Sequence, residues 1–334
     1  MRRGAPTIYH VAERAGVSLA TVSRVNRGTT PVTPETRLRV LRAIEELRYT
    51  PSRLGRSLAE GRHDATGIVF PDMSGPYYSE VILGYEEAAT AAGHSVLILA
   101  THGRPGARHL VLDLAARVDG MVLMGRTVDD ELVAHLEERG TPAVLLARPP
   151  VGTADVVRSG NRRSAEAITG HLLGHGRRSL AFVGDPNASP DAHARWKGFL
   201  AAHRRLAVPI PRSPVRCSYR EHEGRAAVAE LLAAANPPDG LVCANDEIAL
   251  GAYTAAREAE LEVGVHLAVS GWDDILAARL ITPPLTTVRQ PMRQLGSTAA
   301  RLLIERIENP RREARRVVLP TTPVIRASCG CHPT

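Results

Sequence analysis

The chain has no long hydrophobic run, few cysteines and few aromatic residues. None of its apolar runs reaches the roughly 18 residues that span a membrane, so we expect no membrane partner. Its basic start, MRRGAPTIYHVAERAG, lacks the apolar stretch of a secretory signal, which predicts a cytoplasmic protein. The cysteines form no Cys-x-x-Cys pair, so we expect free thiols and no metal site at Cys217, Cys243, Cys329 and Cys331.

The sequence also lacks the short motifs of common enzyme classes. No Gly-x-Gly-x-x-Gly follows an expected strand, and there is no Walker-type phosphate loop or His-Glu-x-x-His zinc motif. His171 and His175 stand four residues apart on an expected helix, but no third ligand is evident, so we interpret them as solvated helix residues. We therefore expect no enzyme activity, no catalytic residue and no cofactor.

Positive charge is concentrated at the N-terminus. Residues 1–62 contain twelve arginines and five glutamates, which accounts for the whole formal net charge of +7, and residues 63–334 are close to neutral. A basic head on a neutral body is typical of a nucleic-acid-binding module. A membrane-surface patch would need an apolar face rich in Trp, Phe and Leu, which residues 1–62 lack.

Two short helices joined by a tight turn are expected near the N-terminus. Thr7 can cap a helix over 8–15, and Gly16 can end it in a left-handed conformation. Ser18 can cap a second helix over 19–26, within GVSLATVSRVNRG. A small helix with basic side chains at this place is the first hint of a DNA-reading element.

A third helix is predicted to begin at Thr33-Pro34-Glu35, where an N-cap residue precedes a first-turn proline. Its expected apolar ladder is Leu38, Leu41, Ile44 and Leu47. Two short helices around a glycine-containing turn, braced by a longer helix, are typical of a helix-turn-helix unit.

Beyond residue 65, short apolar runs alternate with helix-length segments, which indicates buried parallel strands in an α/β fold. The runs are Thr66–Phe70, Ser95–Ala100, Gly120–Met124, Ala143–Ala147, Leu180–Val183, Leu241–Ala244 and Leu267–Ser270. This stretch is too long for one comfortable sheet. The predicted fold is therefore an all-α helix-turn-helix domain followed by two doubly wound parallel-sheet lobes.

The expected domains are residues 1–50 for DNA binding, 51–62 as a hinge helix or linker, and 63–334 for effector binding. One lobe is expected from about 63–160 plus 291–319, and the other from about 161–290 plus 320–334. Ligands bind beyond the carboxyl ends of parallel strands. Polar residues follow the expected strands there, namely Asp72, Arg148, Asn245, Asp246, Asp273 and Asp274.

Several motifs occur in one order along nearly the whole chain. The head carries TIYHVAERAGVSLATVSRV and then PVTPETRLRVLRAIEELRYTPSRLGRSLAEGR. The body carries FPDMSGPYYSEVILGYEEAATAAG, HLLGHGRRSLAFVG, ANDEIALGA, VSGWDD and TPPLTTVRQP. Together they resemble the LacI/GalR family of bacterial transcription regulators, whose body has the periplasmic-binding-protein-like I fold.

The resemblance implies that the helix after Ser18 enters the DNA major groove. Leu19 and Ala20 would meet base edges, and Arg24 would contact phosphate or guanine. Val22 and Val25 are expected in the core instead. The implied DNA-binding residues are Thr7, Ser18, Leu19, Ala20, Thr21, Ser23, Arg24, Arg27, Arg53, Arg56 and Leu58.

Residues 51–60, PSRLGRSLAE, resemble the family's hinge, which wedges a leucine into the minor groove. Leu58 occupies that position, and Arg53 and Arg56 are placed to follow phosphates. Gly55 stands where the family usually has alanine, so we expect a hinge that is less ordered without DNA. Ordinary linker packing of Leu58 is the alternative.

The resemblance also implies that the two lobes close on a small ligand. The implied effector-binding residues are Asp72, Tyr77, Tyr78, Arg148, Arg195, Tyr219, Asn245, Trp272, Asp273 and Gln290. Planar donors and acceptors beside aromatic faces suit a sugar. Packing between the lobes is the alternative for Trp272 and Tyr78, and helix capping is the alternative for Asp72 and Asp246.

Two carboxylates common in sugar-binding members are missing, since Ala147 and Gly160 occupy those positions. Three explanations stay open. The ligand is bound differently, it carries its own negative charge toward Arg148 and Arg195, or it is no simple pentose or hexose.

The favoured function is a sequence-specific DNA-binding repressor of a carbohydrate-related operon, controlled by a sugar or sugar derivative. The expected partners are palindromic operator DNA, the effector and a second copy in a homodimer, since no heptads follow Pro320. The alternatives are an enzyme or sugar-binding protein with a non-specific DNA anchor, an exported binding protein, and an architectural DNA protein. The missing signal argues against export, and the large cleft-bearing body argues against a purely architectural role.

Overall fold

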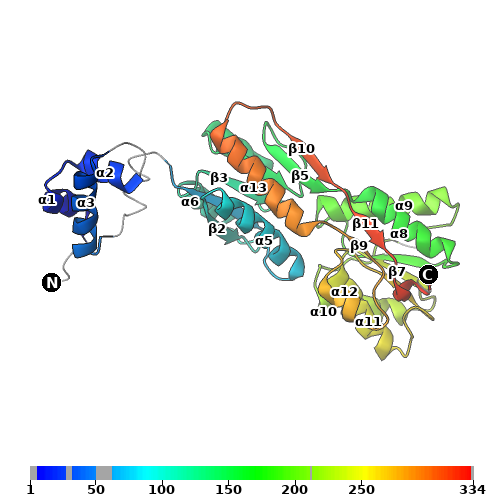
Figure 1. The fold of residues 1–334 in the computed structure, drawn as a ribbon. Coiled ribbons are helices and arrows are strands. Elements are labelled where there is room, and N and C mark those ends of the chain that lie inside the picture. Colours follow the sequence, from blue (N-terminus) through cyan, green and yellow to red (C-terminus); the bar gives the residue numbers. More distant parts are fainter. Residues whose placement is uncertain (1–5, 28–31, 50–61, 211–212, 332–334) are drawn as a thin grey trace. The chain divides into compact units, whose positions relative to one another are not determined.

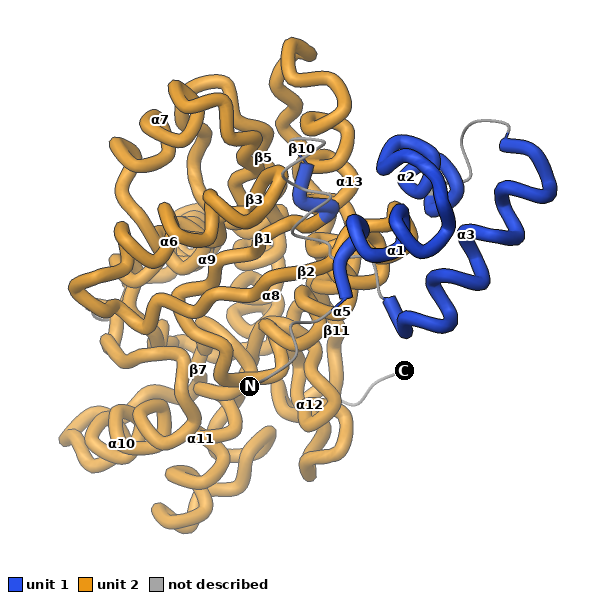
Figure 2. Tube along the Cα trace, turned by 90° about the vertical axis from the view of Figure 1, so that its left-hand side faces the viewer, with its two compact units in different colours: residues 1–64 blue, residues 65–334 orange. Residues whose placement is uncertain are grey.

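The computed structural model describes residues 6–27, 32–49, 62–210 and 213–331. The chain forms two compact units, a head of residues 1–64 and a body of residues 65–334 (Figure 2). Within the described ranges, no helix has the length and apolar character needed to cross a membrane.

Three helices build the head, as predicted: α1 (Ile8–Ala15), α2 (Leu19–Arg27) and α3 (Pro34–Glu46). Thr7 is the N-cap residue of α1, and Gly16 ends that helix with a left-handed φ of 62°. The backbone N–H of Thr21 donates to Ser18 Oγ over 3.2 Å at the start of α2. These caps set the tight turn between the first two helices.

The core of the head is built around Val11, Val22 and Val40, which are fully buried. The predicted ladder on α3 is wrong in its first half, because Leu38 and Leu41 are 55% and 44% exposed. The inward stripe of α3 instead runs through Val40, Ala43, Ile44 and Leu47. The residues of that stripe are three or four positions apart, so they stay on one face of the helix. Residues spaced strictly three apart drift away from that face.

A six-stranded sheet forms the first part of the body, in the order β10-β5-β4-β3-β1-β2. All its neighbouring strands are parallel. The strands are β1 (Ala65–Phe70), β2 (Ser95–Ala100), β3 (Gly120–Met124), β4 (Ala143–Leu146), β5 (Asp155–Ser159) and β10 (Arg316–Leu319). The edge strand β10 therefore comes from a distant part of the sequence.

Helices cover both faces of this sheet (Figure 1). α5 (Pro76–Ala91) and α13 (Met292–Glu308) pack together on one face, and α6 (Ala107–Ala115) and α7 (Asp130–Glu138) cover the other. Alternate strand residues serve the two faces: Ile68 joins the α5 and α13 side, and Val69 joins the α6 and α7 side. Both faces are therefore apolar, as the continuous runs predicted.

A three-stranded parallel sheet forms the second part, in the order β6-β7-β8. Its strands are β6 (Leu180–Val183), β7 (Gly240–Cys243) and β8 (Ala268–Ser270). The helices of this part are α8 (Arg162–Gly174), α9 (Pro190–Arg205), α10 (Glu221–Leu232), α11 (Asp246–Glu258) and α12 (Leu276–Leu280), followed near the C-terminus by the short 3₁₀ helix η1 (Ala327–Cys329). β9 (Thr287–Arg289) and β11 (Thr322–Val324) form an antiparallel pair beside this sheet.

The chain passes between the two sheets three times, near Gly160, Gln290 and Thr321. These crossings are hydrogen-bonded to one another. The Gly160 N–H donates to the Leu319 carbonyl over 2.8 Å, and Ser159 Oγ donates to Gln290 Oε1 over 2.8 Å. The crossings thus form one connected strip between the two sheets.

One charged cluster is sealed inside the first part. The fully buried Asp155 carboxylate accepts from Arg312 Nη2 over 2.7 Å and from Arg306 Nε over 3.1 Å. Burial by itself raises the pKa of Asp155, but hydrogen bonds from Arg312, Arg306 and the Arg315 N–H lower it overall. The ionised carboxylate therefore ties β5 to the turn after α13.

Candidate functional site

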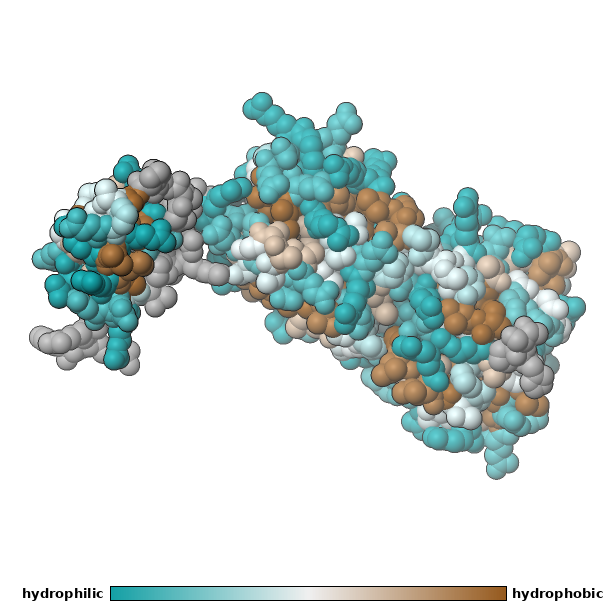
Figure 3. Space-filling view, viewed as in Figure 1, coloured by the Kyte–Doolittle hydropathy of each residue, from teal (hydrophilic) through white to brown (hydrophobic). Residues whose placement is uncertain are grey.

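The exposed face of α2 carries the side chains that the sequence predicted to touch DNA. Leu19 is 38% exposed, and Ala20 and Arg24 are exposed as well. Val22 and Val25 are buried, which confirms their expected place in the core. Among the described residues of the head, no ion pair occupies Arg24, so its guanidinium is available to an anion. The face of the head seen in Figure 3 is mainly hydrophilic.

The predicted hydroxyl contacts are partly engaged within the head. Ser18 Oγ and Thr21 Oγ1 lie 2.9 Å apart, and Thr7 Oγ1 lies 3.0 Å from His10 Nδ1. Ser23 is half-buried. Arg27 is the last residue of α2. Arg53, Arg56 and Leu58, together with Gly55, lie outside the described residues.

A cleft of about 330 Å³ lies where the strands of both sheets end. This is the edge at which parallel α/β sheets bind ligands. Eight of the ten predicted effector-binding residues line it: Asp72, Tyr77, Tyr78, Arg195, Tyr219, Asn245, Asp273 and Gln290. Ala147 also lines it, at a position where the family resemblance had implied a carboxylate.

Arg195 is the buried cation of the cleft, at 6% exposure. Its Nε donates to Asn161 Oδ1 over 2.8 Å, and its Nη1 donates to the Ala244 carbonyl over 2.6 Å. Its guanidinium carbon lies 4.4 Å from the centre of the Trp272 ring. These contacts fix the plane of the guanidinium and leave Nη2 without a hydrogen-bond partner among the described residues.

Two carboxyl groups accompany Arg195 in the cleft. Asn161 Nδ2 donates to Asp191 Oδ1 over 2.9 Å, and Gln290 Nε2 donates to Asp273 Oδ1. Burial raises the pKa of Asp191, and it raises the pKa of Asp273 well above its ordinary value, in both cases against the attraction of Arg195. Either group can therefore accept a hydrogen bond, and a protonated one can also donate.

Asp273 has a backbone φ of 120°, which is unusual for a residue with a side chain. Its N–H donates to the Val288 carbonyl over 2.8 Å, so the surrounding strands hold this conformation. Backbone strain of this kind concentrates at ligand-binding positions.

Charged side chains from both parts of the body meet at one side of the cleft. Arg220 Nη2 forms an ion pair with Asp72 Oδ2 over 2.5 Å, joining the loop after β1 to the start of α10. Glu247, at the start of α11, also lines the cleft. Burial raises the pKa of Glu247, and the nearby Arg220 opposes that shift.

Aromatic rings supply the apolar walls. The rings of Tyr77 and Tyr78 lie 5.4 Å apart, nearly perpendicular, and Tyr219 Oη lies 2.8 Å from Ser189 Oγ. Burial raises the pKa of Tyr77 and of Tyr78, so both phenols keep their protons at neutral pH. The two rings offer flat faces for C–H groups, and their hydroxyls offer donors.

Arg148 does not line the cleft, which corrects its predicted placement. It is 1% exposed, its Nη1 donates to the Val128 carbonyl over 3.1 Å, and its Nη2 pairs with Asp130. Successive side chains at the end of a strand point to opposite sides. Because Ala147 faces the cleft, Arg148 points away from it toward α7.

Trp272 does not line the cleft either. It is 2% exposed and packs against Ala165, Ile168 and Val288. Its ring packs against the Arg195 guanidinium, so Trp272 affects the cleft only through Arg195. Helix capping by Asp246 is also wrong: Asn245 caps α11, and the Asp246 carboxylate accepts from the Ile275 N–H over 2.9 Å.

The sequence reasoning missed several residues that line the cleft, namely Arg126, Ser189, Asp191, Arg220 and Glu247. Arg126 follows the end of β3 and was detectable by the strand-end rule that found Asp72. Asp191 stands in the first turn of α9, where an acidic residue is ordinarily explained by the helix dipole.

The interpretation of His171 as a solvated residue is wrong. It is half-buried, and its Nε2 lies 3.4 Å from the sulfurs of both Cys329 and Cys331. No disulfide bond joins Cys217, Cys243, Cys329 or Cys331 in the structure.

Both the head and the body match known protein families. Residues 7–52 match the model for bacterial regulatory proteins of the lacI family, and residues 169–329 match a periplasmic binding protein-like domain. The ribose operon repressor of Escherichia coli (strain K12) is 32% identical over 324 residues, covering 96% of this chain and 98% of the relative.

Two solved structures extend the likeness to the fold. The lac repressor dimer bound to operator and the anti-inducer ONPF is 27% identical with a TM-score of 0.87, covering 98% of this chain and 100% of that one. The complex of the transcriptional regulator CelR with cellobiose is 31% identical with a TM-score of 0.73, covering 97% and 99%. The chain therefore belongs to the LacI family of bacterial regulatory proteins.

Proposed function

We propose that this protein is a transcriptional repressor whose affinity for operator DNA is set by a small polyhydroxylated effector bound in the cleft. The observation that carries the effector class is the arrangement around Arg195. A planar cation lies near the carboxyl groups of Asp191 and Asp273 in a cleft that three tyrosines also line, which is the donor, acceptor and ring set that a sugar uses.

The acceptors of this cleft differ from those common in sugar-binding relatives. Ala147 and Gly160 supply no carboxyl group, but Asp191 and Asp273 supply two from other positions. The first of the three explanations left open by the sequence is thereby favoured: the effector is a sugar or sugar derivative held by a different pair of acids. Arg195 Nη2 and the tyrosine hydroxyls are donors available to it.

For DNA, the proposal places α2 in the major groove, with Leu19 and Ala20 toward base edges and Arg24 toward phosphate or guanine. Leu58 is the proposed minor-groove wedge, with Arg53 and Arg56 beside it. The proposed assembly is a homodimer on a palindromic operator, because a two-fold symmetric protein matches an inverted repeat; the lac repressor structure is described as a dimer bound to operator.

The proposed lobes are about 63–160 plus 291–319 and about 161–290 plus 320–334, joined at the three crossings, with 51–62 as the hinge. An effector shifts the arrangement of the lobes only if it binds one arrangement more tightly than the other. The protein acts without catalysis in this scheme, and it works in the cytoplasm because operator DNA is there.

The DNA-binding part is tested by selecting bound duplexes from a random pool at controlled salt. We expect an inverted repeat, with an affinity that falls steeply as salt rises because phosphate contacts release counterions. Recovery of no inverted repeat would overturn the specific-repressor proposal.

The effector part is tested by thermal-shift screening, because a ligand that binds the folded state raises its apparent stability. Ribose, cellobiose, sugar phosphates and purines are the first probes. Stabilisation by a sugar supports the proposal, and stabilisation by purines alone would replace the effector class while leaving the repressor intact.

A further inference from the structure

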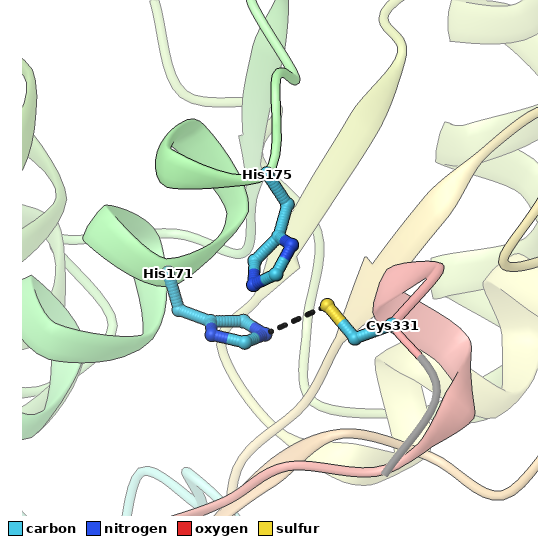
Figure 4. Close-up of side chains that lie close together, drawn as sticks. All are labelled: His171, His175 and Cys331. Carbon is cyan, nitrogen blue, oxygen red and sulfur yellow. Dashed lines mark hydrogen bonds between the residues drawn. The ribbon is translucent and has the colours of Figure 1, made fainter. Parts of the chain in front are cut away.

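A cluster of histidine and cysteine side chains joins α8 to the C-terminal segment. His171 lies in the last turn of α8 and His175 is the C-cap residue of that helix, with the two ring centres 4.5 Å apart. One ligand atom from each of His171, His175 and Cys331 lies within 4.8 Å of the other two. Figure 4 shows the two rings and the sulfur converging on one space.

Cys329 brings a second sulfur to the same histidine. His171 Nε2 lies 3.4 Å from the Cys329 sulfur and 3.4 Å from the Cys331 sulfur. The Cys329 thiol donates to the Arg326 carbonyl over 3.0 Å, and the single proton or in-plane lone pair of His171 Nε2 can make one good hydrogen bond, to one of the two sulfurs. A cation bound by all three atoms would satisfy them together.

Gly330 allows the two cysteines to reach the same histidine. Its φ of 87° is in the left-handed region, and a Cβ at this position would collide with the Gly264 carbonyl oxygen. The chain therefore reverses sharply between Cys329 and Cys331. Any other residue at position 330 would be strained and would collide with that carbonyl.

We propose that His171, His175 and Cys331 bind one zinc ion, and that the Cys329 sulfur, 3.4 Å from His171 Nε2, exchanges its hydrogen bond to the Arg326 carbonyl for the fourth zinc bond. Imidazole and thiolate are the ligands of tetrahedral zinc sites with two cysteines and two histidines. Zn–S and Zn–N bonds of about 2.3 and 2.0 Å at tetrahedral angles separate a sulfur from a nitrogen by about 3.5 Å. The two nitrogen–sulfur distances of 3.4 Å at His171 already match that requirement.

The zinc fastens the C-terminal segment to the second part of the body. Ser328, which lies in η1 next to Cys329, is already anchored: its Oγ accepts from the Thr286 N–H over 2.7 Å and donates to the Val269 carbonyl over 2.6 Å. Binding at the cluster adds a link from η1 to α8. Because zinc binds four ligands held together in this arrangement more tightly than the same residues in the unfolded chain, it stabilises the body.

The test uses the full-length, tag-free, reduced protein and measures zinc by chelator competition. We expect one zinc per chain. Cobalt in its place should show thiolate charge-transfer absorption and the strong visible bands of tetrahedral coordination. Zinc at about 100-fold excess over its Kd should raise Tm by about 5 °C.

His175→Ala and Cys331→Ser should each weaken zinc binding by more than about 100-fold, since losing a direct ligand costs more than losing a ligand's supporting partner. His175 is exposed, so its replacement spares the fold. The matched controls are Cys217→Ser and His109→Ala, which should keep the wild-type affinity and Tm shift.

The proposal is overturned if the reduced wild-type protein binds no zinc, or if His175→Ala and Cys331→Ser bind zinc as tightly as the wild type. The first result would leave the two thiols as a free pair. The second would place the metal elsewhere on the chain.

Discussion

Replacing Arg195 by alanine removes the buried cation of the cleft. The change leaves Asn161 Oδ1 and the Ala244 carbonyl without their donor, and it removes the positive charge that opposes the raised pKa of Asp273. An effector would lose a planar donor and meet a more easily protonated acid. Removing one partner of a buried charged contact costs about 2–5 kcal/mol of binding energy. We therefore expect effector affinity to fall by about 30-fold or more.

The measurement is titration calorimetry with the sugar identified by screening, alongside operator binding at fixed salt. Operator affinity without effector should stay within about twofold, because Arg195 belongs to the body and α2 to the head. Arg148→Ala is the matched control, since that arginine is equally buried but pairs with Asp130 and the Val128 carbonyl outside the cleft. Its effector affinity should stay near the wild-type value.

The reasoning about the cleft is refuted if Arg195→Ala binds the sugar as tightly as wild type, or if Arg148→Ala loses as much affinity as Arg195→Ala. Urea unfolding of both variants separates a lost contact from a lost fold. Lysine keeps the charge of arginine but lacks its planar fork. The sugar affinity of Arg195→Lys should therefore lie between those of the wild type and Arg195→Ala.

Three further expectations concern the head, the lobe contact and the buried cluster. Arg24→Ala should reduce the salt slope of operator binding by about one per head, measured by titrations at several salt concentrations, and Arg14→Ala, already paired within the head, should not. Arg220→Ala should weaken sugar binding by about two- to fivefold at low salt and less at high salt, whereas Arg225→Ala, whose ion pair lies away from the cleft, should leave calorimetric affinity unchanged. Asp155→Asn should lower the free energy of unfolding, measured in urea, by about 3–5 kcal/mol, because it leaves Arg306 and Arg312 without their counter-charge. Since the folded pKa of Asp155 is lowered, its contribution is present above the unfolded pKa of about 3.9 and is lost as pH falls through the folded value, so the variant should lack that acid-side loss.

The predicted strands agree with the structure to within one residue at each end, because buried parallel strands appear in a sequence as continuous apolar runs. β5 escaped prediction because its run, DVVRS, contains Asp155 and Arg158. The charge of Asp155 is tolerated there only because Arg306 and Arg312 reach it from about 150 residues further along the chain. No local pattern carries that information.

The cleft shows the same limit at the level of single side chains. The strand-end rule and the family resemblance brought eight residues to the right edge, but neither fixes which way a side chain turns. Arg148, expected after a strand, and Arg195, expected on a helix, were both predicted to bind the effector, and the packing around Ala147 and Trp272 shows that only Arg195 lines the cleft. His171 likewise depends on a C-terminal segment that lies about 160 residues away in sequence.

The cleft also constrains the sign of the effector response. An effector controls operator affinity only through unequal binding to two lobe arrangements. The Asp72–Arg220 ion pair already links the two parts of the body without any ligand. A neutral sugar can leave that pair in place and add its own contacts across it, which favours the arrangement seen here. An anionic effector would compete with Asp72 for Arg220 and so oppose that arrangement. We therefore expect an anionic effector to weaken this lobe contact and a neutral sugar to leave it in place, and raising the salt concentration should weaken the anionic case more than the neutral one.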